Sequence, residues 1–460
     1  MNQLEFFKRI AYYLRYHGGD MSYPPLAVWE DKLNLKEIKK AWQKLADDIL
    51  SDRQKHDKVG IYLHIPFCVS KCFYCNCISF ARTQQTHHKI YLDCLEKEIK
   101  FLNIQKKIKI RTFYIGGGTP SILKPALLER LMKMAQDNFN LSDCRQIMTE
   151  ISPYTASWLK IKILKNYGVN KITIGVQTLD SSVLKKMDRL QEKNMVLNAF
   201  RQARKAGIKY INIDLMAGLP GQTIKSFTET LKEILKLKPD TVHINPFFPA
   251  SFTPFSLKGR RLNKADIEKR TKMINLARQL IQEHHPSVFE KDEMEKENIQ
   301  LFNSSKFNSS VLGLGWGALS HVRNYLHYAK NPNYENYTEN LQKNRFPETF
   351  GCFLNQKDEM RANLINAFER EQTVDIKNFT LLFDKDPLLV FKKEFKKLAS
   401  LDKIKIEENI IRMLIKNRIE PFVYSKLFYD PSAVSKLKKI IKPKKHQDID
   451  LKLASFYETG

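Results

Sequence analysis

The sequence predicts an α/β protein whose main body is an open, partial barrel of six βα units, written (β/α)6. Short runs rich in β-branched and aromatic residues recur between residues 60 and 250, and at least the first five precede stretches of helical periodicity. Strands that alternate with helices in this way favour a parallel sheet with helices outside it. Six units are too few to close an eight-stranded barrel. The runs are residues 60–66, 110–115, 145–152, 171–177, 208–215 and 240–247.

Two smaller parts flank this body. Residues 1–58 are predicted to be mostly helical, with a break at residues 16–25, where two glycines and two prolines end the first helix. We expect Val28 and Trp29 to begin the next helix. Towards the C-terminus, residues 260–300 are expected to be mostly helical. Farther along, residues 403–407 and 410–414 form a strand pair that is typical of the wing of a small winged-helix-like α+β domain.

Composition limits the class of protein. The chain has 460 residues, of which 43% are hydrophobic and 28% charged, as in ordinary soluble globular proteins. No window approaches the roughly 18 apolar residues of a membrane span, and the first residues lack the apolar segment of a signal peptide. Seven cysteines, an odd number, suit a reducing compartment. We therefore expect a cytoplasmic protein without a membrane span.

The net charge of +27 favours anionic partners, which include nucleic acid, anionic membranes and polycarboxylates. Most basic residues are scattered among acidic ones, and only residues 436–445 form a basic run. No aromatic residue interleaves that run, so we interpret it as a solvated surface rather than a nucleic-acid patch.

Four cysteines, Cys68, Cys72, Cys75 and Cys77, lie within ten residues directly after the first predicted strand. The first three are spaced C-x3-C-x2-C, which suits a cubane iron–sulfur cluster with three cysteine-bound irons and a fourth left open. A zinc site and a redox dithiol are the alternatives. Structural zinc usually takes two ligand pairs about a dozen residues apart, and no second Cys/His pair of that kind follows here.

Polar residues stand at the ends of the later predicted strands, where buried strands have no structural need for them. The ends of parallel strands in barrel-like folds converge on the face that carries the chemistry. Each residue alone could instead cap a helix N-terminus, but their occurrence in phase favours a common site. They are Gly116–Pro120, Glu150, Gln177, Asp214, His243 and Asn245.

The cysteine motif resembles that of the radical S-adenosylmethionine (SAM) enzymes, C-x3-C-x-aromatic-C, with Tyr74 in the aromatic position. The additional Cys77 resembles a narrower branch, the oxygen-independent coproporphyrinogen III oxidases. The resemblance implies one [4Fe-4S] cluster on Cys68, Cys72 and Cys75, whose open iron chelates SAM. The superfamily is known for the partial barrel that the strand pattern predicts.

Further segments resemble the same family. Gly116-Gly117-Gly118-Thr119-Pro120 is similar to the glycine motif, in which a strand edge meets the amino group of SAM and glycine permits the close approach. A turn is the alternative for such a glycine run. By resemblance, SAM contacts are implied for Tyr62, Glu150, Gln177, Arg189 and Asp214, and contacts to a possible second SAM for Gln177, Arg189, Tyr74 and Cys77. The family often has Glu-x-Asp-Pro where this chain has Glu150-Ile-Ser152-Pro.

Two other segments carry the resemblance outside the barrel. Ser22-Tyr23-Pro24 is similar to an N-terminal segment that lies over the active site in the oxidases, although Gly19-Asp20-Met21 replaces their preceding Arg-Tyr-Thr. Leu312–Ser320 resembles a glycine-rich segment that closes the SAM site, with a tight β-hairpin or turn as the alternative. We expect four parts: an N-terminal segment covering the active site, 1–58; a radical SAM core, 59–300; a core-closing connection, 301–355; and a C-terminal winged-helix-like domain with a basic tail, 356–460.

The resemblance implies an oxidoreductase that cleaves SAM reductively and abstracts hydrogen from its substrate through a 5'-deoxyadenosyl radical. In coproporphyrinogen oxidation, a step of porphyrin and heme biosynthesis, two propionates then lose CO2 to become vinyl groups. The implied partners are a small-molecule substrate, a polycarboxylate tetrapyrrole in that case, and an electron donor such as flavodoxin or ferredoxin. Nucleic acid is not expected as a partner.

Three other functions remain open. One is a radical methyltransferase or cyclopropane-forming enzyme that uses a second SAM as reactant. Another is a SAM-binding heme chaperone, although the known chaperones generally lack the fourth cysteine and the Ser-Tyr-Pro segment. The third, a basic nucleic-acid-binding iron–sulfur protein, lacks a recognisable module.

The remaining cysteines are expected to lie outside the cluster site. Cys94 and Cys352 fall in segments that we interpret as helices, and Cys144 falls just before a strand. Cys77 is the candidate catalytic residue, since a thiol at the mouth of the cavity can contact a second SAM or donate hydrogen to a substrate radical. The alternative is that Cys77 is a small packing residue.

Overall fold

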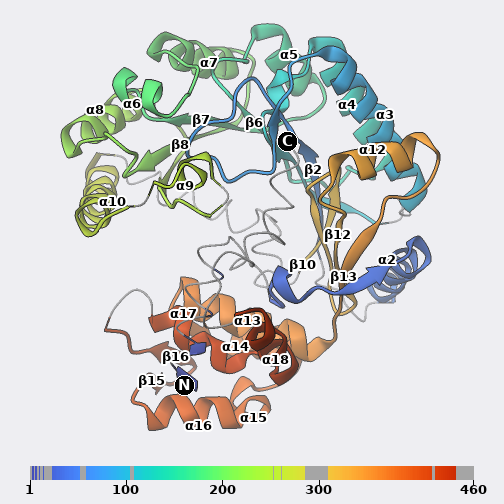
Figure 1. Cartoon of the computed structure of the whole chain (residues 1–460), viewed down its shortest axis with the longest axis vertical. Coiled ribbons are helices and arrows are strands. Elements are labelled where there is room, and N and C mark those ends of the chain that lie inside the picture. The colour runs from blue at the N-terminus through green and yellow to red at the C-terminus, as the bar shows by residue number, and fades with distance from the viewer. Residues whose placement is uncertain are drawn as a thin grey trace.

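The computed structural model describes residues 23–51, 58–103, 108–251, 253–260, 262–284, 309–416 and 420–441, with residues 3, 4, 6, 7, 10 and 14. Figure 1 shows a curved sheet with helices along its outer side and a mainly helical C-terminal body beneath the open side. The predicted residues Gly19–Ser22, residues 285–308 and the basic tail beyond residue 441 lie outside the described part of the chain.

Six parallel strands form the main body, as the sequence predicts. Their order in the sheet follows their order in the chain, and every neighbouring pair is parallel. They are β2 (Lys58–Ile65), β5 (Ile110–Gly117), β6 (Gln146–Ile151), β7 (Lys171–Gln177), β8 (Tyr210–Ala217) and β9 (Thr241–Pro246). The predicted bounds differ from these by two residues or fewer. The α/β fold class with a parallel core is therefore confirmed.

Helices connect the strands and cover the outer face of the sheet (Figure 1). They are α3 (Gln85–Leu102), α4 (Pro125–Asn138), α5 (Trp158–Asn166), α6 (Ser181–Lys186), α7 (Lys193–Lys205) and α8 (Ile224–Leu235). In α8, Thr223 and Ser226 form a capping box, and Phe227, Leu231 and Ile234 are buried at helical spacing. This amphipathic pattern directs the helix onto the sheet.

The sheet continues beyond β2 to eleven strands among the described residues. β10 (Ser309–Leu314) pairs with β2 in parallel, and the other additional strands pair antiparallel. These are β11 (Leu319–Val322), β12 (Leu326–Lys330), β13 (Thr349–Phe353) and β1 (Asp31–Leu33). The glycine-rich segment Leu312–Ser320 thus forms a β-hairpin, and its expected place beside SAM stays a prediction. Gly315 and Gly317 take positive φ angles in its turn.

Two expectations about these segments are wrong. Val28 and Trp29 do not begin a helix, because residues 26–28 form a single 3-10 turn (η1, Leu26–Val28) that leads into β1. The helix α2 (Leu35–Leu50) starts only after Asn34, which forms a capping box with Glu37. Cys352 lies in strand β13 rather than in a helix, because its neighbours pair with β12 and Cys352 itself faces His327.

The C-terminal part has a separate core. A three-stranded sheet contains β14 (Thr373–Asp375), β16 (Ile410–Met413) and β15 (Ile404–Glu407), in that order. The predicted pair is confirmed as the antiparallel hairpin β15–β16. The helices around this sheet are α13 (Gln356–Arg370), α14 (Ile376–Phe383), α15 (Pro387–Val390), α16 (Lys392–Ser400), α17 (Glu420–Tyr424) and α18 (Pro431–Ile440), with the 3-10 turn η5 (Ser425–Phe428). Phe6, Phe7, Ile10 and Leu14 belong to the same hydrophobic core.

Two helices follow the last parallel strand, and a small strand pair lies at the cysteine loop. After β9 come the short α9 (Pro254–Leu257) and then α10 (Lys264–His284), which falls in the region predicted to be helical. A two-stranded pair, β3 (Phe67–Cys68) and β4 (Phe80–Ala81), brackets the cysteine loop. Among the described residues, no helix is long and apolar enough to cross a membrane.

Candidate functional site

The cysteine loop, residues 66–79, leaves the carboxyl end of β2 and is held by hydrogen bonds to neighbouring segments. The Phe73 amide donates to the Met187 carbonyl at 2.9 Å, and the Lys71 ammonium donates to the carbonyls of Cys77 (2.6 Å) and Ser79 (3.0 Å). Cys68 is buried, Cys72 and Cys75 are half-buried, and Cys77 is exposed. All four are free thiols. The loop therefore keeps its sulfur ligands available at the edge of the barrel.

The residues around these thiols suit a cubane cluster. Three thiols form a soft donor set, and each thiolate of such a cluster binds a different iron. In the described parts of the chain, no three His, Cys, Asp or Glu side chains converge on a single-ion position. The Thr119 hydroxyl lies 3.6 Å from the Cys68 Sγ, and the Arg189 Nη1 lies 3.6 Å from the Cys72 Sγ. Both groups can donate hydrogen bonds to sulfur.

Gly118 keeps the space beside the first cysteine open. A Cβ at this position would lie 2.7 Å from the Phe67 carbonyl oxygen and 2.9 Å from the Cys68 Sγ. Gly117, directly before it, has a φ of 110° and would place a Cβ 2.8 Å from the His64 ring. The glycine motif is thus required by the close approach of β5 to the cysteine loop.

The fold shifts the pKa values of two neighbouring thiols, Cys75 and Cys77, in opposite directions. A hydrogen bond with Cys77 lowers the pKa of the Cys75 thiol to about 6, against the opposing effect of burial. The same hydrogen bond raises the pKa of the Cys77 thiol well above its usual range. The Cys77 amide also donates to the Cys75 Sγ at 3.4 Å. Cys75 is therefore poised to ionise and bind metal, while Cys77 stays a thiol beside it.

Glu150 lies at the carboxyl end of β6 and faces the interior of the barrel. It accepts a hydrogen bond from the Tyr114 hydroxyl. Burial raises the pKa of Glu150 to about 7, against the effect of this hydrogen bond, and Asp214 raises it further. A carboxyl group of this kind ionises readily when a cation, such as the amino group of a ligand, takes the place of the missing solvent.

Tyr62 connects this interior to the cysteine loop. Its ring packs against that of Tyr114 with 5.3 Å between centroids, and its hydroxyl lies 2.9 Å from the His64 Nδ1. The His64 Nε2 lies 2.7 Å from the Ile78 carbonyl oxygen. Burial lowers the pKa of His64 to about 4, so the imidazole is neutral at pH 7 and donates from the nitrogen next to Ile78. This chain of contacts fixes the loop to β2.

Asp214, on β8, is held by two polar neighbours. The buried Asn212 donates from its amide to the Asp214 carboxylate at 2.7 Å, and the His243 Nδ1 lies 3.3 Å from the same oxygen. The Asp214 side chain remains 24% exposed, which leaves part of the carboxylate free for a ligand.

Arg189 lies beside Tyr74 and Gln177, two other residues for which SAM contacts are expected. Its guanidinium donates to the Tyr74 hydroxyl at 2.8 Å and to the Gly175 carbonyl. Gln177 has a positive φ of 68° at a β-bulge in β7, where the register with β8 shifts. A Cβ on Gly175 would lie 3.2 Å from the Gln177 Nε2 and 3.4 Å from the Arg189 Nη2, which places both side chains around one glycine.

The structure thus gathers the predicted residues into two groups at one end of the sheet. Tyr62, Glu150 and Asp214 line the interior, whereas Tyr74, Gln177 and Arg189 lie beside the cysteines. Their roles in binding stay predictions. The sequence interpretation missed Tyr114, His64, Asn212 and Lys71, although Tyr114 and Asn212 alternate with core residues and face inward as the period of a strand requires.

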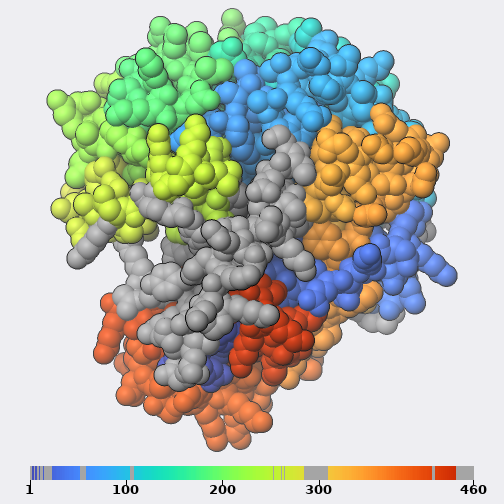
Figure 2. Space-filling model, viewed as in Figure 1, coloured from blue at the N-terminus to red at the C-terminus, as the bar shows by residue number. Residues whose placement is uncertain are grey.

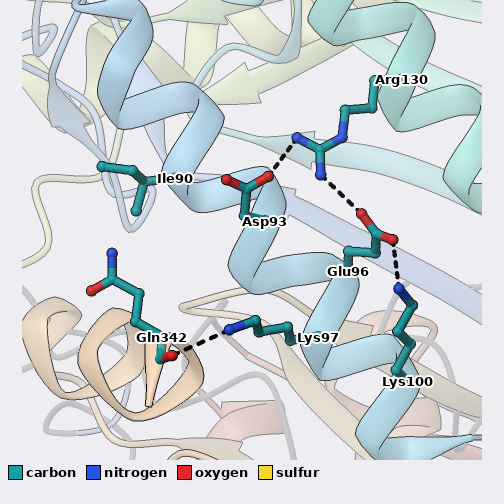
Figure 3. A pocket seen from close by; sticks show the side chains of 7 residues that line it. All are labelled: Ile90, Asp93, Glu96, Lys97, Lys100, Arg130 and Gln342. Carbon is teal, nitrogen blue, oxygen red and sulfur yellow. Dashed lines mark hydrogen bonds and ion pairs between the residues drawn. The ribbon is translucent and has the colours of Figure 1, made fainter. Parts of the chain in front are cut away.

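Figure 3 shows a separate hollow, of about 410 Å³, on the outer surface between α3, α4 and α12 (Tyr334–Gln342). Arg130 pairs with Asp93 (2.6 Å) and Glu96 (2.9 Å), and Lys100 pairs with Glu96 (2.7 Å). Lys97 donates to the Leu341 carbonyl at 3.0 Å, and the lining of the hollow contains none of the predicted site residues.

The comparisons with known proteins agree with this site. The family model described as Radical SAM superfamily matches residues 62–234, the stretch that contains the cysteine loop and the strands β5 to β8. Residues 62–234 therefore form a region of the radical SAM type, whose cofactors are a [4Fe-4S] cluster and S-adenosylmethionine. The residues described above fit both groups.

Within the superfamily, the chain is similar to oxygen-independent coproporphyrinogen III oxidases. It is 27% identical to the one from Helicobacter pylori (strain J99) over 421 residues, which cover 85% of this chain and 88% of the relative. It is also 33% identical to the heme chaperone HemW of Buchnera aphidicola, over 44% of this chain and 53% of the relative. The solved coproporphyrinogen III oxidase of Escherichia coli has the same fold, with a TM-score of 0.72 and 22% identity over 89% of this chain and 96% of that one.

Proposed function

We propose that the protein is a radical SAM oxidoreductase that oxidatively decarboxylates coproporphyrinogen III or a closely related polycarboxylate tetrapyrrole. The observation that carries the proposal is the arrangement around Arg189. Tyr74 and Cys72 accept its hydrogen bonds, Gln177 lies alongside, and Cys77 lies beside Cys75. These are the positions at which the oxidase branch resembles this chain beyond the general cysteine motif.

The extent of the similarity also supports an oxidase. The alignment with the Helicobacter pylori oxidase covers 85% of this chain and 88% of that relative, whereas the alignment with the Buchnera chaperone spans about half of each chain. The heme chaperone is nevertheless the second candidate, because the Buchnera chaperone is 33% identical to this chain over the part that it matches.

When bound, the cluster and SAM supply an adenosyl radical that removes hydrogen from an unactivated carbon. The protein's own residues bind, orient and exclude water. The Glu150 and Asp214 carboxylates face the interior and suit a cationic or hydroxyl-bearing ligand, while Arg189 keeps a positive charge beside the cysteine loop. A small, acidic one-electron carrier such as flavodoxin or ferredoxin is the electron donor in this proposal.

The test is anaerobic reconstitution of the cluster followed by incubation with SAM, coproporphyrinogen III and a reductant. Mass spectrometry of all products should show the loss of two carboxyl groups together with 5'-deoxyadenosine. Methylated or cyclopropanated products would indicate the methyltransferase alternative. Tight heme binding without productive consumption of SAM would indicate the chaperone.

A further inference from the structure

A group of exposed basic and apolar side chains borders the outer side of the cysteine loop. Leu257 is 61% exposed and Leu190 is 45% exposed. Lys258 and Arg260 follow α9 and Lys185 lies in the last turn of α6, and all three side chains are exposed. We call this the loop-flanking surface, which consists of Phe73, Lys185, Leu190, Leu257, Lys258 and Arg260.

The loop-flanking surface is fastened to the segment that carries two of the cysteines. The Phe255 amide donates to the Phe73 carbonyl at 2.9 Å. The Lys258 ammonium lies 4.5 Å and the Arg260 guanidinium 5.0 Å from the centre of the Phe73 ring. Phe73 and Tyr74 also pack against a small hydrophobic core that includes Met187 and Phe255. Lys258 and Arg260 are therefore fixed next to residues 72–75.

Figure 2 shows α9 beside the blue segment of the cysteine loop on one face of the molecule. The loop itself is thin there, because residues 69–79 are all half-buried or exposed. Electron transfer weakens steeply with distance, so a protein that reduces the cluster must dock where little of the chain intervenes. This face meets that requirement.

We propose that the loop-flanking surface is the docking site of a small acidic protein that carries single electrons. The inference rests on the proposed function, since it names the partner that supplies reducing electrons to that site. In the transfer, the carrier loses one electron and the cluster gains it, with no atom exchanged. Exposed leucines among cations match the common anatomy of an interface, with an apolar centre and a charged rim that selects the sign of the partner.

The charges near this face favour an acidic partner. Lys185, Lys258 and Arg260 are exposed there, and the connection from α6 to α7 carries the exposed carboxylates Asp188 and Glu192. The overall charge of +27 adds long-range attraction for an anionic protein. Such attraction raises association rates most strongly at low ionic strength.

The test is the double variant Lys258→Glu/Arg260→Glu, with Lys205→Glu as a matched control. Lys205 is also exposed and also lies over an aromatic ring, 5.4 Å from the centre of Trp158, but it ends α7 just before the amino end of β8, whereas the cysteine loop follows the carboxyl end of β2. The anaerobic holoprotein, without SAM or substrate, is mixed with reduced flavodoxin, and the loss of cluster absorbance is followed by stopped flow. The same reaction with dithionite provides the reference.

We expect the double variant to be reduced by flavodoxin roughly tenfold more slowly than wild type at low salt, with a smaller difference at high salt. Reduction by dithionite, iron content and the rates of Lys205→Glu should be unchanged. A second variant, Leu257→Gln, should weaken flavodoxin binding several-fold, whereas Leu50→Gln, at an exposed leucine of α2, should not.

Other results would overturn the proposal. One is an unchanged rate with flavodoxin in the double variant, or a wild-type cluster that flavodoxin does not reduce at all. Another is a raised KM for coproporphyrinogen III in dithionite-driven turnover with normal reduction by flavodoxin, which would assign the surface to substrate carboxylates. Because reduction is measured without substrate, a protein that fails to convert coproporphyrinogen III can still support the docking site.

Discussion

Gly118→Ala is the sharpest test of the link between the glycine motif and the cluster. The added methyl group would lie 2.7 Å from the Phe67 carbonyl oxygen and 2.9 Å from the Cys68 Sγ. The backbone there cannot move aside easily, because the Gly118 amide donates to the Ile65 carbonyl at 2.8 Å. Contacts this short require shifts of several tenths of an ångström, and overpacking of this kind costs about 1–3 kcal/mol of stability.

The consequence for cluster binding follows from the atom that the methyl group meets. Since the sulfur of Cys68 must point to an iron, displacing it should lower the retained cluster to well under half of the wild-type amount. Gly207→Ala is the matched control. Gly207 has a φ of +79° and its Cβ would meet only the Lys165 side chain, at 3.7 Å. An alanine at this position lowers the stability by about 1–2 kcal/mol because of its left-handed conformation, and it does not contact the cysteine loop.

Iron and sulfide content after anaerobic reconstitution, together with thermal unfolding of both apoproteins, separates the two effects. We expect similar losses of stability in the two variants but a loss of cluster only in Gly118→Ala. A full, spectroscopically normal cluster in Gly118→Ala would refute the reasoning, as would an equal loss of iron from Gly207→Ala.

Three further predictions concern the cysteines and the interior carboxylate. Cys72→Ala should lose the cluster and Cys94→Ala should keep it, as measured by iron content, because Cys94 is buried in α3 away from the loop. Cys77→Ser should retain the cluster and reductive SAM cleavage but lose product formation, and undiminished turnover would show Cys77 to be a packing residue. Burial raises the pKa of Glu150 to about 7, so the stability that its protonated form contributes is complete below pH 4.5 and is lost as the pH rises through 7. Between pH 5 and pH 8, the free energy of unfolding of the wild-type apoprotein should therefore fall by on the order of 3 kcal/mol relative to that of Glu150→Gln. Over the same pH range, the affinity for SAM should increase in the wild type but not in this variant.

The parallel half of the sheet could be predicted because its sequence signal is local. Each of the six parallel strands β2, β5, β6, β7, β8 and β9 lies in a short run that the sequence marks as a strand, and helices separate these runs. The cysteine loop could be predicted as well, because the spacing of its cysteines restricts the kinds of metal centre that they can bind. The polar residues at strand ends could be grouped because parallel strands share one direction.

The antiparallel extension could not be predicted in the same way. Its strands β1 and β13 meet across more than three hundred residues of sequence, as the pairing of Asp31 with Gly351 shows. The prediction of a helix at Cys352 is wrong because its five-residue strand precedes the long helix α13 with only two residues between them. Tyr114 and Asn212 were overlooked for a related reason. Tyr114 contacts Glu150 on the neighbouring strand, and Asn212 contacts Asp214 two residues farther along the same strand. The sequence pattern does not indicate which of the inward-facing side chains will be in contact.

A buried ion pair fastens this extension to the catalytic half of the sheet. Glu98 of α3 and Lys330 of β12 are both fully buried, with 2.7 Å between the Lys330 Nζ and the Glu98 Oε1. Lys330 also donates to the Gly313 carbonyl, and the second oxygen of Glu98 accepts from the Gly315 amide at 2.9 Å. Removing one partner from such a pair costs about 3–5 kcal/mol, because the other charge is left buried and uncompensated.

The position of this pair explains why a charge is tolerated in the core. The pair holds the turn at Gly315, which lies close to β2. A Cβ on Gly315 would lie 2.8 Å from the His64 carbonyl oxygen. Tyr91, which hydrogen-bonds that carbonyl at 2.6 Å, also accepts from the Trp316 amide at 3.1 Å. His64 in turn contacts Tyr62 and Ile78. The glycine-rich hairpin is therefore tied to α3 by the buried pair, and it is tied through the Tyr91 hydroxyl to β2, the strand that leads into the cysteine loop. A hairpin that contributes no predicted ligand thus supports the strand that carries the cluster ligands.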